Sequence, residues 1–161
     1  MYKLTNDKTL FEKFWVDERD NFPKFWRDGA NSENVTWGEF KAFCDGMERI
    51  YSIDDVALIY VEKTGVGRAN MHFSLLRGEG VNTTELTELR DIIKQDFPLM
   101  YAWCGKRNKG LRRILEQIGF EWRGLEMHWQ QSHGKVLDWL CYIYSEVSVA
   151  NGTKSLINYN Q

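Results

Sequence analysis

The chain has 161 residues, which is long enough for one domain with a sizeable hydrophobic core. Its formal net charge of −2 excludes a general electrostatic attraction to nucleic acid or to a membrane surface. Three cysteines without a close pair argue against a disulfide framework and for a reducing compartment, and no spacing of Cys and His indicates a zinc site.

The first third of the chain predicts a short strand followed by two helices. Residues 2–4 are a candidate edge strand, and the apolar stripe within residues 7–22 predicts a helix. Thr36 is a candidate N-cap, with Glu39 in the position that completes a capping box. We expect this second helix to continue its apolar stripe as far as Ile50.

The rest of the chain alternates strand and helix patterns. Residues 56–61 and 69–76 flank a glycine-containing turn and predict an antiparallel hairpin. The remaining predicted elements are a helix over 84–97, a buried strand over 99–104, a helix over 109–118, and a hairpin of 125–129 with 136–144.

The predicted order is β-α-α-β-β-α-β-α-β-β, which indicates an α/β fold. Its sheet should be mixed and mostly antiparallel, flanked by helices, with one right-handed crossover after Arg77. We expect residues 1–150 to form a single domain and the polar residues 151–161 to be a flexible tail.

A glycine-rich loop, residues 77–82, lies between a predicted strand and a predicted helix. Backbone N–H groups at such a loop, backed by a helix N-terminus, can bind a diphosphate, and glycine permits the close approach. Two glycines between a strand and a helix are more often a plain turn. The loop therefore needs a second motif before it indicates a site.

That second motif is Asn108 followed eleven residues later by Gly119-Phe120. The two motifs together resemble the GNAT superfamily of N-acetyltransferases, whose loop is typically Gln/Arg-x-x-Gly-x-Gly/Ala. Its second signature is Asn-x-x-Ala-x-x-x-Tyr-x-x-x-Gly-Phe. Arg77 and Gly80 match the loop, and the resemblance covers residues 56–144.

The resemblance implies a GNAT-like fold and an N-acyltransferase that moves an acyl group from acetyl-CoA to an amine acceptor, without a metal. The backbone amides of residues 78–82 would face the CoA pyrophosphate. The space between the strand ending at Arg77 and the strand over 99–104 would hold pantetheine. The implied cofactor-binding residues are Arg77, Gly78, Glu79, Gly80, Val81, Asn82 and Asn108.

Three positions depart from the family pattern. Asn82 replaces the last small residue of the loop, where it would also be a good N-cap. Glu79, together with Glu85, places acid beside the expected phosphate site. Leu115 occupies the position of the general-acid tyrosine, and a leucine cannot protonate a thiolate. Leu115 also fits an apolar helical stripe, so we expect it in the core.

Four side chains are candidates for proton transfer. Glu62 ends one strand and His72 lies within the next, and either could act as the base, although a surface glutamate and a packed histidine are the commoner interpretations. Tyr101 and Tyr142 could replace the missing acid, although each could be a plain core aromatic; we expect Tyr142 to wall the acceptor side. Nothing in the sequence lowers the pKa of Cys104, so we expect it in the core.

Residues 106–113 include five basic side chains that could bind CoA phosphates or another anionic partner, or form a solvated helix face. No recognised nucleic-acid motif accompanies them, so nucleic acid is the partner with least support. The polar N-terminus and the lack of an apolar run of about 18 residues predict a cytoplasmic protein without a membrane span.

Residues 71–77 are also similar to GNAT-like proteins encoded by tailed bacteriophages. This narrower resemblance implies an alternative function, a catalytically inactive head-assembly or virion protein whose partners are phage head proteins. Its location would be the host cytoplasm or the virion. The three departures at positions 79, 82 and 115 favour this alternative, and the preserved motif register favours retained CoA binding.

Overall fold

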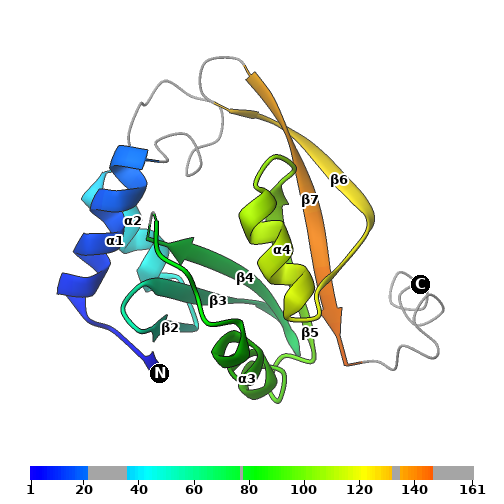
Figure 1. Cartoon of the computed structure of the whole chain (residues 1–161), viewed down its shortest axis with the longest axis horizontal. Coiled ribbons are helices and arrows are strands. Elements are labelled where there is room, and N and C mark those ends of the chain that lie inside the picture. The colour runs from blue at the N-terminus through cyan, green and yellow to red at the C-terminus, as the bar shows by residue number, and fades with distance from the viewer. Residues whose placement is uncertain (22–35, 77, 132–134, 147–161) are drawn as a thin grey trace.

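A computed structural model describes residues 1–21, 36–76, 78–131 and 135–146 (Figure 1). No helix in these residues is long and apolar enough to cross a membrane. The elements in chain order are β1 (Tyr2–Leu4), α1 (Lys8–Asn21), α2 (Trp37–Asp45), β2 (Arg49–Ile53), β3 (Ala57–Gly65), β4 (Arg68–Leu75), α3 (Thr83–Ile93), β5 (Leu99–Gly105), α4 (Lys109–Gln117), β6 (Glu121–Gln131) and β7 (Lys135–Ser145).

The strands form one seven-stranded sheet in the order β1-β2-β3-β4-β5-β7-β6. Strands β4 and β5 pair in parallel, and the other neighbouring strands pair antiparallel. The predicted fold class, a mixed and mostly antiparallel sheet flanked by helices, is confirmed. The α3 helix connects the two parallel strands, as a parallel pair requires.

The structure contains one strand that the sequence did not predict, β2. The capping box of Thr36 and Glu39 is present, but α2 ends at Asp45, where the Gly46 amide donates to the carbonyl of Ala42. The chain then forms β2, which pairs along its whole length with β3. The expected continuation of the helix to Ile50 is therefore wrong, because pairing in the sheet satisfies the backbone groups of this segment instead.

The predicted helix over 84–97 is also shorter than expected. It begins at Thr83 and ends at Ile93, after which the amide of Asp96 donates to the carbonyl of Ile93 in a tighter turn. Pro98 requires the chain to leave the helical conformation by Phe97, because the residue before a proline is disfavoured in that conformation. Phe97 still packs into the core from this turn.

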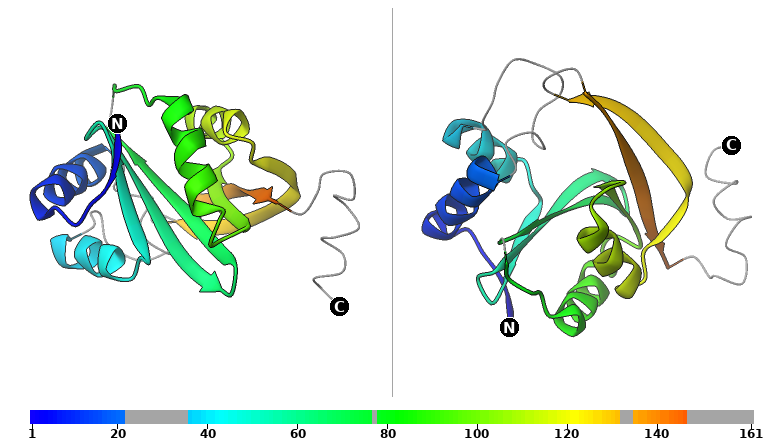
Figure 2. Two further views of the ribbon diagram at one scale, coloured as in Figure 1. Left: turned by 90° about the horizontal axis from the view of Figure 1, so that it is seen from below. Right: turned by 45° about the horizontal axis from the view of Figure 1, so that its top comes forward.

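Two layers of helices cover the sheet, one on each face (Figure 2). Helices α1 and α2 pack against one face, where Leu10, Phe14 and Phe40 join a buried cluster that includes Leu58 and Tyr60 of β3. Helices α3 and α4 pack against the other face in a larger cluster. Its members from the two helices are Leu86, Leu89, Ile93 and Leu115.

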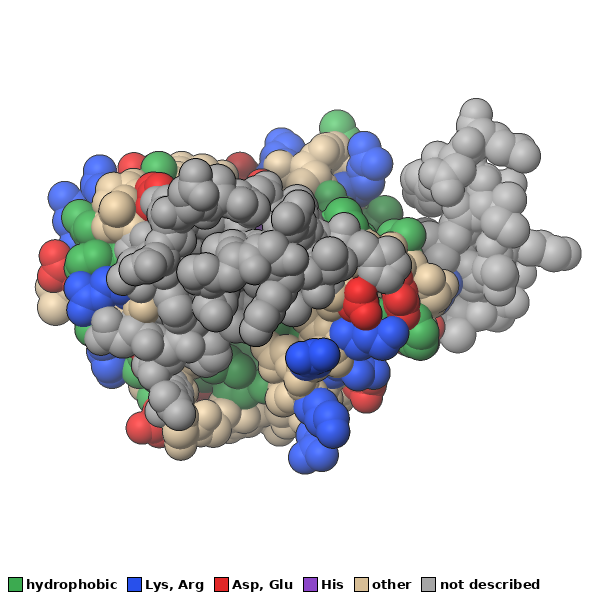
Figure 3. Space-filling view, turned by 90° about the horizontal axis from the view of Figure 1, so that it is seen from above, with side chains coloured by type: hydrophobic (Ala, Val, Ile, Leu, Met, Phe, Trp, Pro, Cys, Tyr) green, Lys and Arg blue, Asp and Glu red, His purple; other side chains and the backbone are tan. Residues whose placement is uncertain are grey.

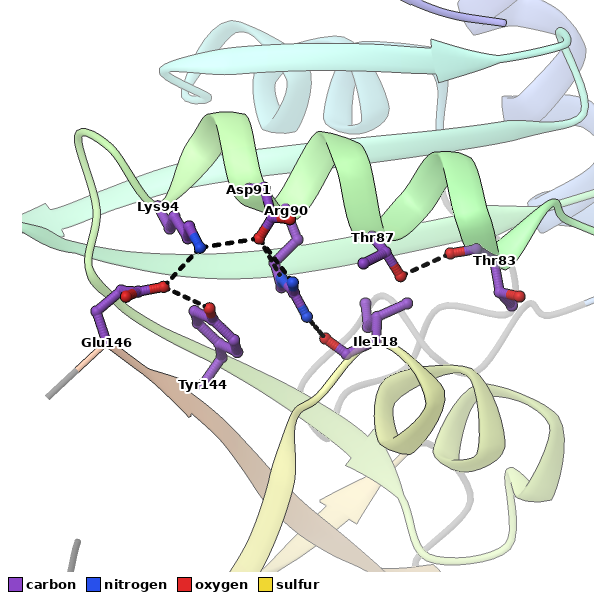
Figure 4. A network of polar contacts seen from close by, with 8 residues as sticks. All are labelled: Thr83, Thr87, Arg90, Asp91, Lys94, Ile118, Tyr144 and Glu146. Atoms are coloured by element: carbon purple, nitrogen blue, oxygen red, sulfur yellow. Dashed lines mark hydrogen bonds and ion pairs between the residues drawn. The ribbon is translucent and has the colours of Figure 1, made fainter. Parts of the chain in front are cut away.

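A polar network ties the end of β7 to the α3–α4 layer (Figure 4). The Arg90 guanidinium donates to the carbonyl of Ile118 and lies over the Tyr144 ring, 4.7 Å from its centroid. Lys94 contacts the Glu146 carboxylate at 2.9 Å, and the Tyr144 hydroxyl donates to the same group at 2.6 Å. Tyr144 pairs with Met100 near the start of β5, so the network stabilises the end of β7 where it pairs with the start of β5.

Candidate functional site

Strands β4 and β5 separate after three paired residues. The pairs are Arg68 with Leu99, Ala69 with Met100 and Asn70 with Tyr101. Beyond them β4 continues beside β3, and β5 continues beside β7 as far as Gly105. Each strand keeps one antiparallel neighbour, so the sheet opens between them. We call this opening the fork; its arms are residues 71–75 and 102–105.

The two faces of the fork differ in chemistry because side chains alternate along a strand. Met71 and Ala102 face the apolar cluster under α3 and α4. Asn70 and Tyr101, which pair at the closed end of the fork, face the α1–α2 layer and are half-buried. One side of the fork is therefore apolar and covered by two helices, and the other is polar.

The glycine loop, residues 78–82, lies at the open end of the β4 arm. Gly78 has a φ of +82°, a conformation that L side chains rarely adopt. A Cβ atom added at Gly78 or at Gly80 would meet no atom within 4 Å. The loop thus leaves room beside its backbone, immediately before the N-terminus of α3. Arg77, the expected first residue of this motif, lies outside the described residues.

Backbone donors remain available in this loop. The Glu79 amide donates to the carbonyl of Leu76, and the Asn82 side chain caps α3 by accepting from the amides of Thr84 and Glu85. In the described part of the chain, no hydrogen-bond partner is found for the amides of residues 80–82. Asn82 is therefore an N-cap, and three successive amides before α3 have no partner among the described residues, as an anion-binding loop requires.

One of the two acidic side chains beside the loop, Glu85, has a positively charged neighbour. The α-amino group of Met1 lies 2.9 Å from the Glu85 carboxylate and also contacts Asp54. The hydrogen bond to Asp54 is the main reason that the pKa of this amino group is raised. Glu79 is exposed and can turn toward solvent. Glu85, one of the two acidic side chains at the expected phosphate site, thus has a cationic partner.

On the polar side of the sheet, next to the fork, the side chains of Glu62, Asn70 and His72 form a hydrogen-bonded group. The Glu62 carboxylate contacts Nε2 of His72 at 2.8 Å and accepts from Nδ2 of Asn70 at 3.3 Å. The side chains of His72 and Glu62 are 33% and 40% exposed, so the pair is open to solvent. The ring of Phe43 from α2 meets the imidazole edge-on at 5.2 Å. Glu62 and His72 are separate candidates in the sequence, and the β3–β4 pairing brings them together.

The sequence predicts that Tyr142 walls the acceptor side; in the structure it lies away from the Glu62–His72 pair. It pairs with Ala102, so it faces α4, on the side opposite Glu62 and His72. Its hydroxyl donates to Glu116 at 3.0 Å and accepts from Nε of Arg112 at 3.2 Å. Burial raises its pKa. Tyr101 is instead the tyrosine on the polar side of the fork.

Leu115 is part of the core, as expected. Its side chain is 0% exposed and belongs to the cluster between α4 and the sheet. The position at which the family pattern has a tyrosine therefore holds a packed apolar side chain. Asn108 caps the same helix, because its side-chain oxygen accepts from the Leu111 amide at 3.1 Å. Asn108 therefore stands where α4 begins, directly after the β5 arm of the fork.

The cysteines are poor nucleophiles. Burial raises the pKa of Cys104 to about 12, that of Cys44 to about 12 and that of Cys141 to about 11. A thiol with such a pKa is not ionised near neutral pH, so the structure offers no cysteine for a covalent acyl intermediate. Among the described residues, no cluster of three or more His, Cys, Asp or Glu side chains could hold a metal ion.

Basic side chains gather where α4 begins. Lys106, Arg107, Lys109 and Arg113 are exposed, and Lys106 contacts Glu126 at 3.3 Å. Arg112 is held by Tyr142 and by the carbonyl of Lys106. Figure 3 shows Lys and Arg side chains on the face seen from the top of Figure 1, the end at which α4 begins. This patch lies at the open end of the fork.

Comparison with solved structures supports the fold. The structure is similar to an N-acetyltransferase from Staphylococcus aureus Mu50, with a TM-score of 0.69, 12% identity, and coverage of 90% of this chain and 97% of that one. It is also similar to Mycobacterium smegmatis RimJ in complex with CoA-disulfide, with a TM-score of 0.65, 14% identity, and coverage of 90% and 81%. An acetyltransferase of the GNAT family from Streptococcus pneumoniae gives a TM-score of 0.61, 11% identity, and coverage of 89% and 97%.

At these identities the likeness establishes the fold and not the activity. The chain therefore has the fold of GNAT acetyltransferases. No protein-family model matches the sequence, and a search of curated proteins finds no relative.

Proposed function

We propose that this protein transfers an acyl group from acetyl-CoA to an amine. One observation carries the proposal. The fork between β4 and β5 has free backbone amides at its open end and a Glu62–His72 pair on its polar side. The first feature suits an anionic cofactor and the second suits the removal of a proton from an acceptor.

The glycine loop fits the diphosphate of CoA. The amides of residues 80–82 have no hydrogen-bond partner within the described ranges, the space beside Gly78 and Gly80 is open, and α3 adds the positive end of its dipole. Arg77 and Asn108 would complete the cofactor site, and Lys109 and Arg113 would add positive charge near its entrance. RimJ, a protein of the same fold, was solved in complex with CoA-disulfide, which supports CoA as the class of cofactor.

Acetyl-CoA would supply the acyl group in an activated form, as a thioester. The protein would prepare the acceptor, because an amine must lose a proton to be acylated. When Nε2 of His72 donates its hydrogen to Glu62, Nδ1 keeps a lone pair that can accept that proton. Glu62 then orients the imidazole and stabilises its protonated form, or takes the proton itself.

The proton for the departing thiolate needs another source, because Leu115 is buried and apolar. Tyr101 is the candidate that the sheet places at the fork on the polar side. Water is the alternative. General-acid assistance is worth roughly 10²–10⁴-fold in rate, so we expect slow transfer if water supplies the proton.

The test is release of CoA from acetyl-CoA with a panel of primary amines. Wild-type protein should release CoA in an amine-dependent manner, and Glu62→Gln and His72→Gln should each lower the rate by about 10²-fold or more. Glu12→Gln, on the exposed side of α1, is the matched control and should behave as wild type. Equal rates for all four proteins would contradict the role of the pair.

Cofactor binding is tested separately by thermal unfolding. Acetyl-CoA at 100 times Kd should stabilise the wild-type protein by about 2.7 kcal/mol, and its Tm should rise accordingly. Gly80→Trp should remove the shift, because the indole would fill the open space beside the loop. No shift with millimolar acetyl-CoA at low salt would refute the enzyme proposal.

The alternative, a non-catalytic phage head-assembly protein, has one structural observation in its favour, the loss of the acid to a fully buried Leu115. Nothing in the fold or in the comparisons supports a phage origin. The alternative requires a folded protein that releases no CoA with any amine and that is also found in phage particles or bound to head components.

A further inference from the structure

Asn70 has one satisfied and one unsatisfied end. It occupies the last position at which β4 pairs with β5, and its Nδ2 donates to Glu62. Its Oδ1 is buried, and no hydrogen-bond partner for it is found in the described part of the chain. Buried carbonyl oxygens are normally paired, so a buried free acceptor at the edge of a candidate site calls for an explanation.

The orientation of this amide is fixed by its neighbour. Rotating the side chain by half a turn would place Oδ1 against the Glu62 carboxylate, and two acceptors cannot satisfy each other. Glu62 therefore holds Nδ2 toward itself and leaves Oδ1 directed elsewhere. The free group is an acceptor, so its natural partner is an N–H or O–H donor that the protein does not supply.

The position of Asn70 indicates which ligand brings that donor. The free amides of the glycine loop precede α3, on the side of the sheet that α3 and α4 cover. Asn70 faces the opposite side, together with Glu62 and His72. Asn70 thus lies beside the Glu62–His72 pair and away from the amides proposed for the phosphate end of the cofactor.

We propose that Oδ1 of Asn70 binds the reacting amine of the acceptor, an inference that rests on the proposed acyl transfer. A primary ammonium group has three hydrogens, so one can be donated to Asn70 while another is removed by the Glu62–His72 pair. An alcohol has a single hydrogen, which the base must take, so its oxygen would face Oδ1 without a bond. Asn70 therefore selects amines over hydroxyl compounds.

The experiment is steady-state CoA release with Asn70→Leu, a substitution of similar shape that lacks the Oδ1 acceptor and also the Nδ2 donor to Glu62. The KM for a primary amine should rise about tenfold, the effect of one lost hydrogen bond, while the KM for acetyl-CoA stays within about twofold. The ratio of amine to matched alcohol turnover should fall. Asn70→Ser, too short to reach the same point, should give the same result and serves if the leucine variant does not fold.

Three outcomes would overturn the inference. An unchanged amine KM with a lowered kcat and an altered pH profile would mean that Asn70 only positions Glu62. An equal rise in both KM values would mean that its effect is not specific to the acceptor. Failure of wild-type protein to release CoA with any amine would refute the proposed function as well, and the wild-type assay alone identifies that case.

Discussion

Replacing Leu115 with alanine tests whether the position of the missing acid is truly core. The side chain is fully buried between α4 and the sheet. Burying a leucine side chain is worth about 1.5–3 kcal/mol, and the cavity left by truncation raises the usual cost to about 2–5 kcal/mol. Because the neighbouring cluster is built on paired strands, which cannot easily collapse into the space, we expect about 3–5 kcal/mol.

The assay is urea unfolding followed by circular dichroism, with thermal unfolding as a second measurement. For a domain of this size the expected loss lowers Tm on the order of 10 °C. Leu125→Ala is the matched control, because the same atoms are deleted from a side chain that is 52% exposed. It should change stability by no more than about 0.5 kcal/mol. A Leu115→Ala loss below about 1 kcal/mol would place residue 115 outside the core and reopen the question of the acid.

Three further predictions follow from the same geometry. Leu115→Tyr should lose about 1–3 kcal/mol in urea unfolding through overpacking and should gain no CoA-release activity, whereas a large gain would show that a tyrosine at this position reaches the fork. Tyr142→Phe should lose about 0.5–1.5 kcal/mol and keep wild-type activity, because the hydroxyl bonds to α4; a collapse of activity would contradict that. Tyr144 and Lys94 donate hydrogen bonds to Glu146 and lower its pKa. The contribution of Glu146 to the free energy of unfolding is therefore complete above about pH 4.3, the usual pKa of a glutamate. It is lost as the pH falls through the lowered pKa. Glu146→Gln should therefore weaken the loss of stability in acid, measured by urea unfolding across pH, and an unchanged acid dependence would refute that role.

Most of the fold could be predicted from the sequence because its elements carry clear patterns. The apolar stripes of α3 and α4 and the strands flanking the β3–β4 turn all agree with the structure. The β2 strand was missed because its first buried residue, Ile50, continues the helical spacing of Phe40, Phe43 and Met47. Only Gly46 marks the end of the helix, and a five-residue strand gives little signal against a longer periodic pattern.

The candidate site was harder to predict because it depends on strand register. Glu62 and His72 lie ten residues apart on a hairpin with an irregularity between Lys63 and Gly65. A shift of one residue would turn His72 to the other face, and the sequence does not determine that shift. The side of the sheet on which Tyr142 lies depends on pairing between β5 and β7, which are far apart in sequence. The unpaired oxygen of Asn70 gives no sequence signal.

The measurement that tests the central claim most directly is a transfer assay with acetyl-CoA isotopically labelled in its acetyl group. Protein, labelled acetyl-CoA and a primary amine are incubated together, and the label is located by mass spectrometry. We predict that the label appears on the amine nitrogen, with one CoA released for each amine acylated and none on the protein, since the cysteines are buried with raised pKa values. Folded wild-type protein that binds acetyl-CoA yet moves no label to any amine, or that carries the label on a cysteine, would contradict the account.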